Sequence, residues 1–219
     1  VQVMLNSAFT VSLPRNPSIN LKVVPGHFTT NHFHTNNYLD LDNLKTNVTM
    51  AKSVAAELAA AYLYDTPVDT VVCMEGTEVI GAYLAEELMK KGMSFINSGR
   101  DIYVVTPISN VHRKLIFQSN TQELIVNRNV ILLVSSVSSG ITLSGALDCL
   151  AYYGAKIAGI SALFNNVNAS HERLDHEINA LFTNENIPDY QIFSPADCPM
   201  CIAGYKLDAI IVHDGYIKI

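Results

Sequence analysis

Residues 129–142, NVILLVSSVSSGIT, carry the strongest structural signal in this chain of 219 residues. The first six are almost entirely apolar, and they predict a strand long enough to lie centrally in a parallel sheet. Residues 135–140 are mostly small or hydroxyl-bearing and predict a loop. From Thr142 to Tyr153 apolar side chains recur at helical spacing, so a helix follows, and Gly154 ends it.

The same alternation of strands and helices extends on both sides of this stretch. Helices are predicted over residues 47–62 and 79–89, and strands over 68–74, 101–106, 156–164 and 209–213. Residues 1–45 are read as irregular. Residues 107–121 are read as a mobile loop or a short hairpin, with residues 123–126 as one arm. Alternating strands and helices favour a single α/β domain built on a doubly wound parallel sheet.

Composition narrows the class of protein. Hydrophobic residues make up 49% of the chain and charged residues 16%, which is typical of an ordered globule. The net charge is −6 with 14 basic residues, so a nucleic-acid-binding surface has little support. No apolar run approaches the ~20 residues that cross a bilayer, and we expect a cytoplasmic protein. The apolar excess favours a homo-oligomer.

The loop before the third helix has the character of an anion site. Backbone N–H groups at a helix N-terminus are unsatisfied and partly positive, and hydroxyl side chains add further donors. An ordinary serine-rich helix cap is the alternative interpretation. The loop is neither a Walker A sequence nor a Gly-x-Gly-x-x-Gly turn, so those two nucleotide-binding classes are set aside.

Residues 130–164 resemble the signature that binds phosphoribosyl pyrophosphate (PRPP) in type I phosphoribosyltransferases. Three further segments resemble the orotate branch of that family: residues 26–40, residues 74–78, and residues 198–207 with their Cys-Pro-Met-Cys sequence. The resemblance implies a type I phosphoribosyltransferase fold with a small hood, formed by residues 1–45 and about 185–207 of the single domain 1–219. It also implies a dimer, Mg²⁺, and transfer of ribose 5-phosphate from PRPP to a nucleobase, orotate first.

The resemblance assigns roles residue by residue. It places the 5′-phosphate on Ser138, Ser139, Gly140, Ile141 and Thr142, the pyrophosphate on Glu75, Gly76 and Thr77, and the base on Phe28 and Thr29.

The sequence departs from the family pattern at two functional places. The acidic pair that contacts the ribose falls on Val134 and Ser135, or on Ser135 and Ser136 in the next register, so no carboxylate is supplied. The basic catalytic loop is reduced to Arg113 and Lys114, which are otherwise solvated loop charges. Two hypotheses therefore stand: an enzyme, or a protein of the same fold that binds PRPP or a nucleotide without turnover.

The cysteines and histidines leave further alternatives open. Cys73 and Cys149 lie in apolar runs and are read as inert thiols. The Cys198–Cys201 pair is half of a zinc site or, in the preferred interpretation, a tight turn with two free thiols; a redox role is the third alternative. The histidines at 27, 32 and 34 are read as a polar loop near the base pocket in preference to metal ligands. No metal-ligating residue is assigned.

Overall fold

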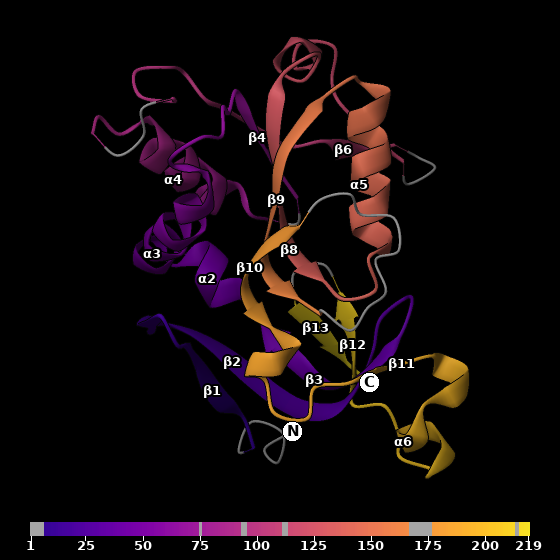
Figure 1. The fold of residues 1–219 in the computed structure, drawn as a ribbon. Coiled ribbons are helices and arrows are strands. Elements are labelled where there is room, and N and C mark those ends of the chain that lie inside the picture. The colour runs from indigo at the N-terminus through magenta and orange to yellow at the C-terminus, as the bar shows by residue number, and fades with distance from the viewer. Residues whose placement is uncertain (1–6, 75, 93–95, 111–113, 167–176, 213–214) are drawn as a thin grey trace.

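The computed structural model describes residues 7–74, 76–92, 96–110, 114–166, 177–212 and 215–219. It contains two larger sheets, and helices cover both faces of the first (Figure 1). No helix within these ranges combines the length and the apolar character that a bilayer-spanning segment requires.

The central sheet has five parallel strands in the order β10-β9-β8-β4-β5. They are β4 (Thr70–Cys73), β5 (Tyr103–Val105), β8 (Asn129–Val137), β9 (Lys156–Asn165) and β10 (Ile178–Thr183). Helices α3 (Val48–Ala59) and α4 (Glu78–Met89) lie on one face, and α5 (Ile141–Tyr152) lies on the other (Figure 1). This architecture confirms the predicted doubly wound α/β fold.

Side-chain alternation along the strands explains why both faces are covered. In β8, Ile131 and Leu133 join the core cluster that contains α3 and α4, whereas Leu132 and Val134 join the cluster that contains α5. Successive side chains of a strand point to opposite faces, so a run with no polar interruption needs a helix layer on each side. Burial raises the pKa of the Cys73 thiol to about 12, and the nearby charge of Glu78 adds to this effect. Cys73 is therefore the inert core thiol that the sequence predicted.

The second sheet, which we call the hood sheet, has the strand order β11-β3-β2-β12-β13, with β1 paired to β2. Its strands are β1 (Phe9–Leu13), β2 (Asn16–Thr29), β3 (His34–Asp40), β11 (Ile192–Phe193), β12 (Ala209–Val212) and β13 (Gly215–Lys218). Figure 1 shows this sheet below the carboxyl ends of the central strands. Segments from both ends of the chain therefore cover one end of the central sheet.

Two predictions about these segments are wrong. Within residues 7–45 the chain is not irregular, since β2 buries Ile19, Leu21 and Val23 in alternation. The prolines concealed this strand; Pro25 is accommodated where the β2–β3 register shifts, a position that tolerates a missing N–H. Residues 209–212 do form a strand, but it pairs with β2 in the hood sheet and not with the central sheet.

The remaining elements are short. They are α2 (Asp42–Thr46), α6 (Pro199–Ile202), the hairpin of β6 (Ile108–Ser109) and β7 (Leu115–Ile116), and single turns at Ala60–Tyr62, Gln122–Leu124, Asn184–Asn186 and Pro195–Asp197. The hairpin alternative for residues 107–121 is confirmed. Residues 123–126 are not one of its arms, because a 3₁₀ turn occupies their start.

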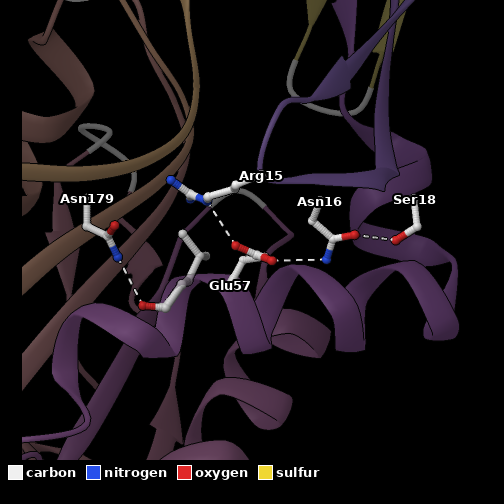
Figure 2. A network of polar contacts seen from close by, with 6 residues as sticks. Arg15, Asn16, Ser18, Glu57 and Asn179 are labelled. Carbon is white, nitrogen blue, oxygen red and sulfur yellow. Dashed lines mark hydrogen bonds and ion pairs between the residues drawn. The ribbon is translucent and has the colours of Figure 1, made fainter.

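Polar contacts fix the hood sheet against the central core. Glu57 of α3 accepts hydrogen bonds from Arg15 Nε at 2.9 Å, in the turn between β1 and β2, and from Asn16 Nδ2 at 3.0 Å, at the start of β2 (Figure 2). In the same region Asn179 of β10 donates to the Leu58 carbonyl at 3.0 Å. The Glu57 contacts therefore connect α3 of the central core to the β1–β2 hairpin of the hood sheet, whereas the Asn179 contact lies within the central core.

Candidate functional site

The strand order itself locates a binding crevice. In the order β10-β9-β8-β4-β5, the connection after β4 and the connection after β8 lead to opposite faces of the sheet. Ligands of open α/β sheets bind at the carboxyl ends of the strands where the order reverses in this way. The loops that follow β4 and β8 are therefore the expected site.

The loop after β8 is shaped as an anion cradle. Strand β8 continues to Val137 and α5 begins at Ile141, so three residues make the connection. Gly140 is the N-cap with φ of 78°, a left-handed conformation in which glycine has no Cβ penalty. No cap side chain bonds to the first turn of α5, and the first N–H groups of a helix have no intrahelical partner. The loop therefore presents backbone donors and the positive end of the helix dipole together.

A cavity of about 450 Å³ opens directly over this loop. Its floor is Ser135, Ser136, Val137, Ser138, Ser139, Gly140, Thr142 and Leu143. Its walls come from the hood sheet and α2: the turn of residues 30–33, Tyr38, Leu39, Leu41, Asp42, Lys45, residues 210–212 and Gly215. The phosphate-binding residues predicted from sequence thus line the cavity, except that Ile141 is not among the lining residues.

Lys45 supplies positive charge in a protein that has little of it. Its side chain is only 6% exposed and its ammonium forms an ion pair with Asp42 Oδ1 at 3.2 Å. Among the described residues that line the cavity, Lys45 is the one lysine or arginine and Asp42 the one carboxylate. An ammonium held this way strengthens the attraction that the helix N-terminus exerts on an anion.

Tyr38 adds a neutral donor to the same wall. Burial, and secondarily the charges of Asp40 and Asp42 and the neighbouring Tyr216, raise the pKa of Tyr38 above its ordinary value. The phenol therefore stays protonated at neutral pH. Its ring packs against Phe28 and Tyr216 at centroid distances of 6.0 and 4.9 Å.

Other predicted site residues lie beside the cavity without lining it. Phe28 is fully buried in the hood core, and Thr29 donates its hydroxyl to the Thr30 carbonyl. Of the two positions predicted to contact ribose, Ser135 lines the cavity, whereas Val134 is 1% exposed and packs in the core beneath α5. In the alternative register, Ser135 with Ser136, both residues are among those that line the cavity.

The loop after β4 has a structural hydroxyl at its centre. Thr77 is fully buried and donates to the carbonyl oxygens of Met74 at 2.7 Å and Leu133 at 3.3 Å. These bonds tie the loop to β8. Gly76 has φ of 76°, and Glu75 lies outside the described residues. Neither Gly76 nor Thr77 lines the cavity described above.

Of the predicted catalytic pair, the structure describes Lys114. Lys114 is exposed at the β6–β7 hairpin, where its N–H donates to Asn110 Oδ1 at 3.0 Å. Arg113 lies outside the described residues. Sequence reasoning assigned no role to Lys45 and Asp42, whose only sequence signal was their position after the segment 26–40 that resembles a base-binding region. The turn of residues 30–33 lies within that segment, and His32, read from the sequence as part of a polar loop near the base pocket, does line the cavity.

The fold and the cavity define a doubly wound α/β protein in which a second sheet covers the loop between β8 and α5, whose backbone donors suit an anion. No protein-family profile and no curated protein matches the sequence. Solved structures do match the fold. The UMP synthase of Leishmania donovani aligns with a TM-score of 0.57 at 18% identity, over 76% of this chain and 34% of that one. The orotate phosphoribosyltransferase of Mycobacterium tuberculosis H37Rv aligns with a TM-score of 0.50 at 13% identity, over 76% and 91%.

The chain therefore has the type I phosphoribosyltransferase fold, as its sequence resemblance implied. It spans about a third of the length of the UMP synthase it matches and most of the orotate enzyme.

Proposed function

We propose that the cavity over the β8–α5 loop binds PRPP, and that the protein transfers its ribose 5-phosphate to a nucleobase with release of pyrophosphate. Orotate is the first candidate base, because one structural match is a UMP synthase and the other is an orotate phosphoribosyltransferase. The observation that carries the proposal is the loop of residues 138–142 beneath a roofed cavity that contains a buried lysine.

The chemistry of the cavity supports a phosphorylated sugar. A phosphate monoester on the loop would accept hydrogen bonds from the first N–H groups of α5 and from Ser138, Ser139 and Thr142. Ser135 and Ser136 precede the loop by two to three residues, at the carboxyl end of β8, where the ribose would follow. The turn of residues 30–33 and Tyr38 form the opposite wall, at the position proposed for the base.

The residues present fit a magnesium ion carried by the ligand. Mg²⁺ in phosphate sites is held by one or two carboxylates together with phosphate oxygens and water. Asp42 offers one carboxylate to the cavity and would be the protein ligand. The ion would supply charge neutralisation at the departing pyrophosphate. In the proposal Arg113 and Lys114 would bind the same leaving group through ionic contacts, whereas Lys45 would pair with the phosphate on the β8–α5 loop.

A second function, binding of PRPP or a nucleotide without turnover, is favoured by one specific observation. The β8 residues that face the cavity, Ser135 and Ser136, have hydroxyls where charge stabilisation of a developing sugar cation calls for carboxylates. Hydroxyls can bind ribose but cannot offset a full positive charge. The two functions share the binding site and differ only in the rate of chemistry.

Pyrophosphate release distinguishes the two functions. The protein is incubated with PRPP and Mg²⁺, and orotate, uracil and the purine bases are supplied in turn. Release that depends on one base supports the transferase and identifies its substrate. Binding of PRPP by calorimetry without release supports the second function. Failure of folded protein to bind PRPP, ribose 5-phosphate and nucleoside monophosphates would remove both.

A carboxylate placed on β8 tests why turnover is slow or absent. Ser135→Asp puts the missing charge in the cavity, and Ser144→Asp makes the same charge change on the exposed side of α5. A transferase that lacks this charge is expected to gain turnover with Ser135→Asp alone. A change in binding without a gain in turnover favours the non-catalytic function.

A cytoplasmic homodimer completes the proposal. All four cysteines are free, which suits a reducing compartment. Light scattering of the purified chain measures its mass in solution, and a monomer at micromolar concentration would contradict the dimer.

A further inference from the structure

Four potential metal ligands from distant parts of the sequence meet under the hood sheet. His27 is on β2, His34 begins β3, and Cys198 and Cys201 flank and occupy the short helix α6. One ligand atom from each lies within 4.8 Å of the other three. His27, His34 and Cys198 are buried, and Cys201 is at the surface.

The separations match the edges of a metal-centred tetrahedron. Metal–nitrogen bonds of about 2.05 Å and metal–sulfur bonds of about 2.3 Å require N···N edges of about 3.3 Å and N···S edges of about 3.6 Å. His27 Nε2 and His34 Nδ1 are 3.3 Å apart. The N···S separations are 3.4 Å and 3.6 Å from His27 Nε2 to Cys198 and Cys201, and 3.4 Å from His34 Nδ1 to Cys201.

Hydrogen bonding alone does not account for this arrangement. A ring nitrogen of histidine carries either one N–H or one lone pair, directed outward in the ring plane. His27 Nε2 has three polar neighbours within 3.6 Å, one nitrogen and two sulfurs. One directed group can serve one of them well. A cation at the centre of the cluster would satisfy all of them simultaneously.

Backbone carbonyls already orient His27 for this role. Its other nitrogen, Nδ1, lies 3.2 Å from the carbonyl oxygens of both Tyr205 and Lys206. Carbonyls only accept, so Nδ1 carries the proton and the Nε2 lone pair points at the cysteines. Metal-bound histidines characteristically donate their second N–H to a carbonyl or carboxylate in this way. The backbone N–H of His27 also donates to Asp208 Oδ2 at 2.8 Å, which fixes the part of β2 that carries the ring.

We propose that His27, His34, Cys198 and Cys201 bind one structural zinc ion. Two nitrogens and two sulfurs at tetrahedral spacing are the donor set that selects Zn²⁺ among common cellular metals. Both thiols lose their protons to solvent on binding, and two thiolates with Zn²⁺ leave the cluster neutral. Neutrality removes much of the cost of burying the charges. Four protein ligands leave no open coordination position, so the role is structural.

The site would lock the hood sheet at the edge of the ligand cavity. Ligands His27 and His34 bracket the turn of residues 30–33, which lines that cavity. Cys198 and Cys201 belong to the C-terminal segment, more than 160 residues away in sequence. The zinc ion would thus connect α6 to the β2–β3 hairpin, two short segments that are far apart in the sequence.

Metal analysis of the wild-type protein is the first test. The chain is purified under reducing conditions without a histidine tag, and zinc is measured by mass spectrometry against protein concentration. One zinc per chain is expected. After removal of zinc, Co²⁺ should give the intense visible bands of a tetrahedral site together with thiolate-to-metal charge transfer in the near ultraviolet.

Matched variants locate the ion. Cys201→Ser changes a surface ligand, Cys149→Ser changes a cysteine outside the cluster, and His32→Ala changes a histidine in the same hairpin. Zinc affinity measured by chelator competition should fall at least about 100-fold in Cys201→Ser and stay at the wild-type value in the other two. The Co²⁺ spectrum of the wild type keeps the test decisive even if a variant misfolds.

Three outcomes would overturn the proposal. One is wild-type protein that contains no zinc and gives no tetrahedral Co²⁺ spectrum. Another is a Cys201→Ser variant that retains zinc with wild-type affinity. The third is a Cys198–Cys201 disulfide in intact-mass measurements of metal-free protein isolated without oxidants, which would support the redox alternative. None of these results depends on PRPP binding.

Discussion

Replacing Lys45 by methionine removes the buried charge of the cavity while keeping most of the side-chain volume. The ammonium is 6% exposed and lies beside the loop that would bind the phosphate. A hydrogen bond to a charged group contributes about 1.5–3 kcal/mol. Loss of one such contact corresponds to a fall in affinity of about 10- to 150-fold. The remaining Asp42 carboxylate then faces the anion unpaired, so the upper part of this range is expected.

Calorimetric titration with ribose 5-phosphate, and separately with PRPP and Mg²⁺, measures the effect at fixed ionic strength. Lys52→Met is the matched control. Lys52 is an exposed residue of α3 whose ammonium lies 5.8 Å from the centre of the Tyr83 ring, away from the cavity. It makes the same change in net charge, so it separates local contact from the overall field of the protein.

Equal affinities of wild type, Lys45→Met and Lys52→Met for both ligands would refute the reasoning, provided that circular dichroism shows all three folded. A ligand site elsewhere on the protein would then be required. An equal loss in both variants would point to long-range electrostatics, and the assignment of Lys45 to the site would fail.

Two further predictions concern the same helix and the core. Gly140→Ala and Gly154→Ala each place a Cβ on a residue with left-handed backbone, at opposite ends of α5. Each substitution should lower the free energy of unfolding by about 1–2 kcal/mol, measured by heat or urea. Only Gly140→Ala should weaken ribose 5-phosphate binding, and equal binding by both variants would contradict the assignment of the loop. The raised pKa of Cys73, from 9.0 to about 12, means that above pH 9 the unfolded chain loses a proton that the folded chain keeps. The contribution of the protonated Cys73 thiol to the free energy of unfolding is therefore complete below pH 9. It declines as pH rises toward 12, by up to about 1.4 kcal/mol per pH unit. Urea unfolding of the wild type and Cys73→Ala is measured between about pH 8 and about pH 10, roughly one unit either side of the ordinary pKa of 9.0. The free energy of unfolding should decline less steeply in the variant, and parallel curves would contradict the buried position of the thiol.

Sequence reasoning succeeded where the structural signal is contiguous. Strand β8, its loop and α5 follow one another within 24 residues, counted from Asn129 to Tyr152, and each carries its own local pattern. The apolar run predicts a strand covered by helices on both faces, and the small residues predict a turn. The helical periodicity of the apolar residues predicts a helix with one buried face. Interactions between residues this close in the sequence produce patterns that can be recognised from the sequence alone.

The hood sheet could not be predicted in the same way. Its central pairing joins Phe28 of β2 to Ala209 of β12, from opposite ends of the chain. The two-residue pairing is too short to impose a pattern on either segment. Nor could the sequence distinguish Lys45 as a cavity residue, because the cavity is formed jointly by α2, the hood sheet and the β8–α5 loop, which are far apart in the sequence.

The histidines and cysteines show the same limit with a larger consequence. Judged separately, a Cys-x-x-Cys turn and two histidines are each half of a site, and the absence of a second cysteine pair argued against metal. The antiparallel β2–β3 hairpin brings His27 and His34 together, and β11 and β12 return the chain so that α6 lies next to them. The same strands carry the turn of residues 30–33 to the cavity wall. Strand pairing, and not residue order, therefore assembles both the proposed zinc site and the roof of the phosphate cavity. Loss of the metal should consequently loosen the base-side wall while leaving the β8–α5 loop, which belongs to the central sheet, intact.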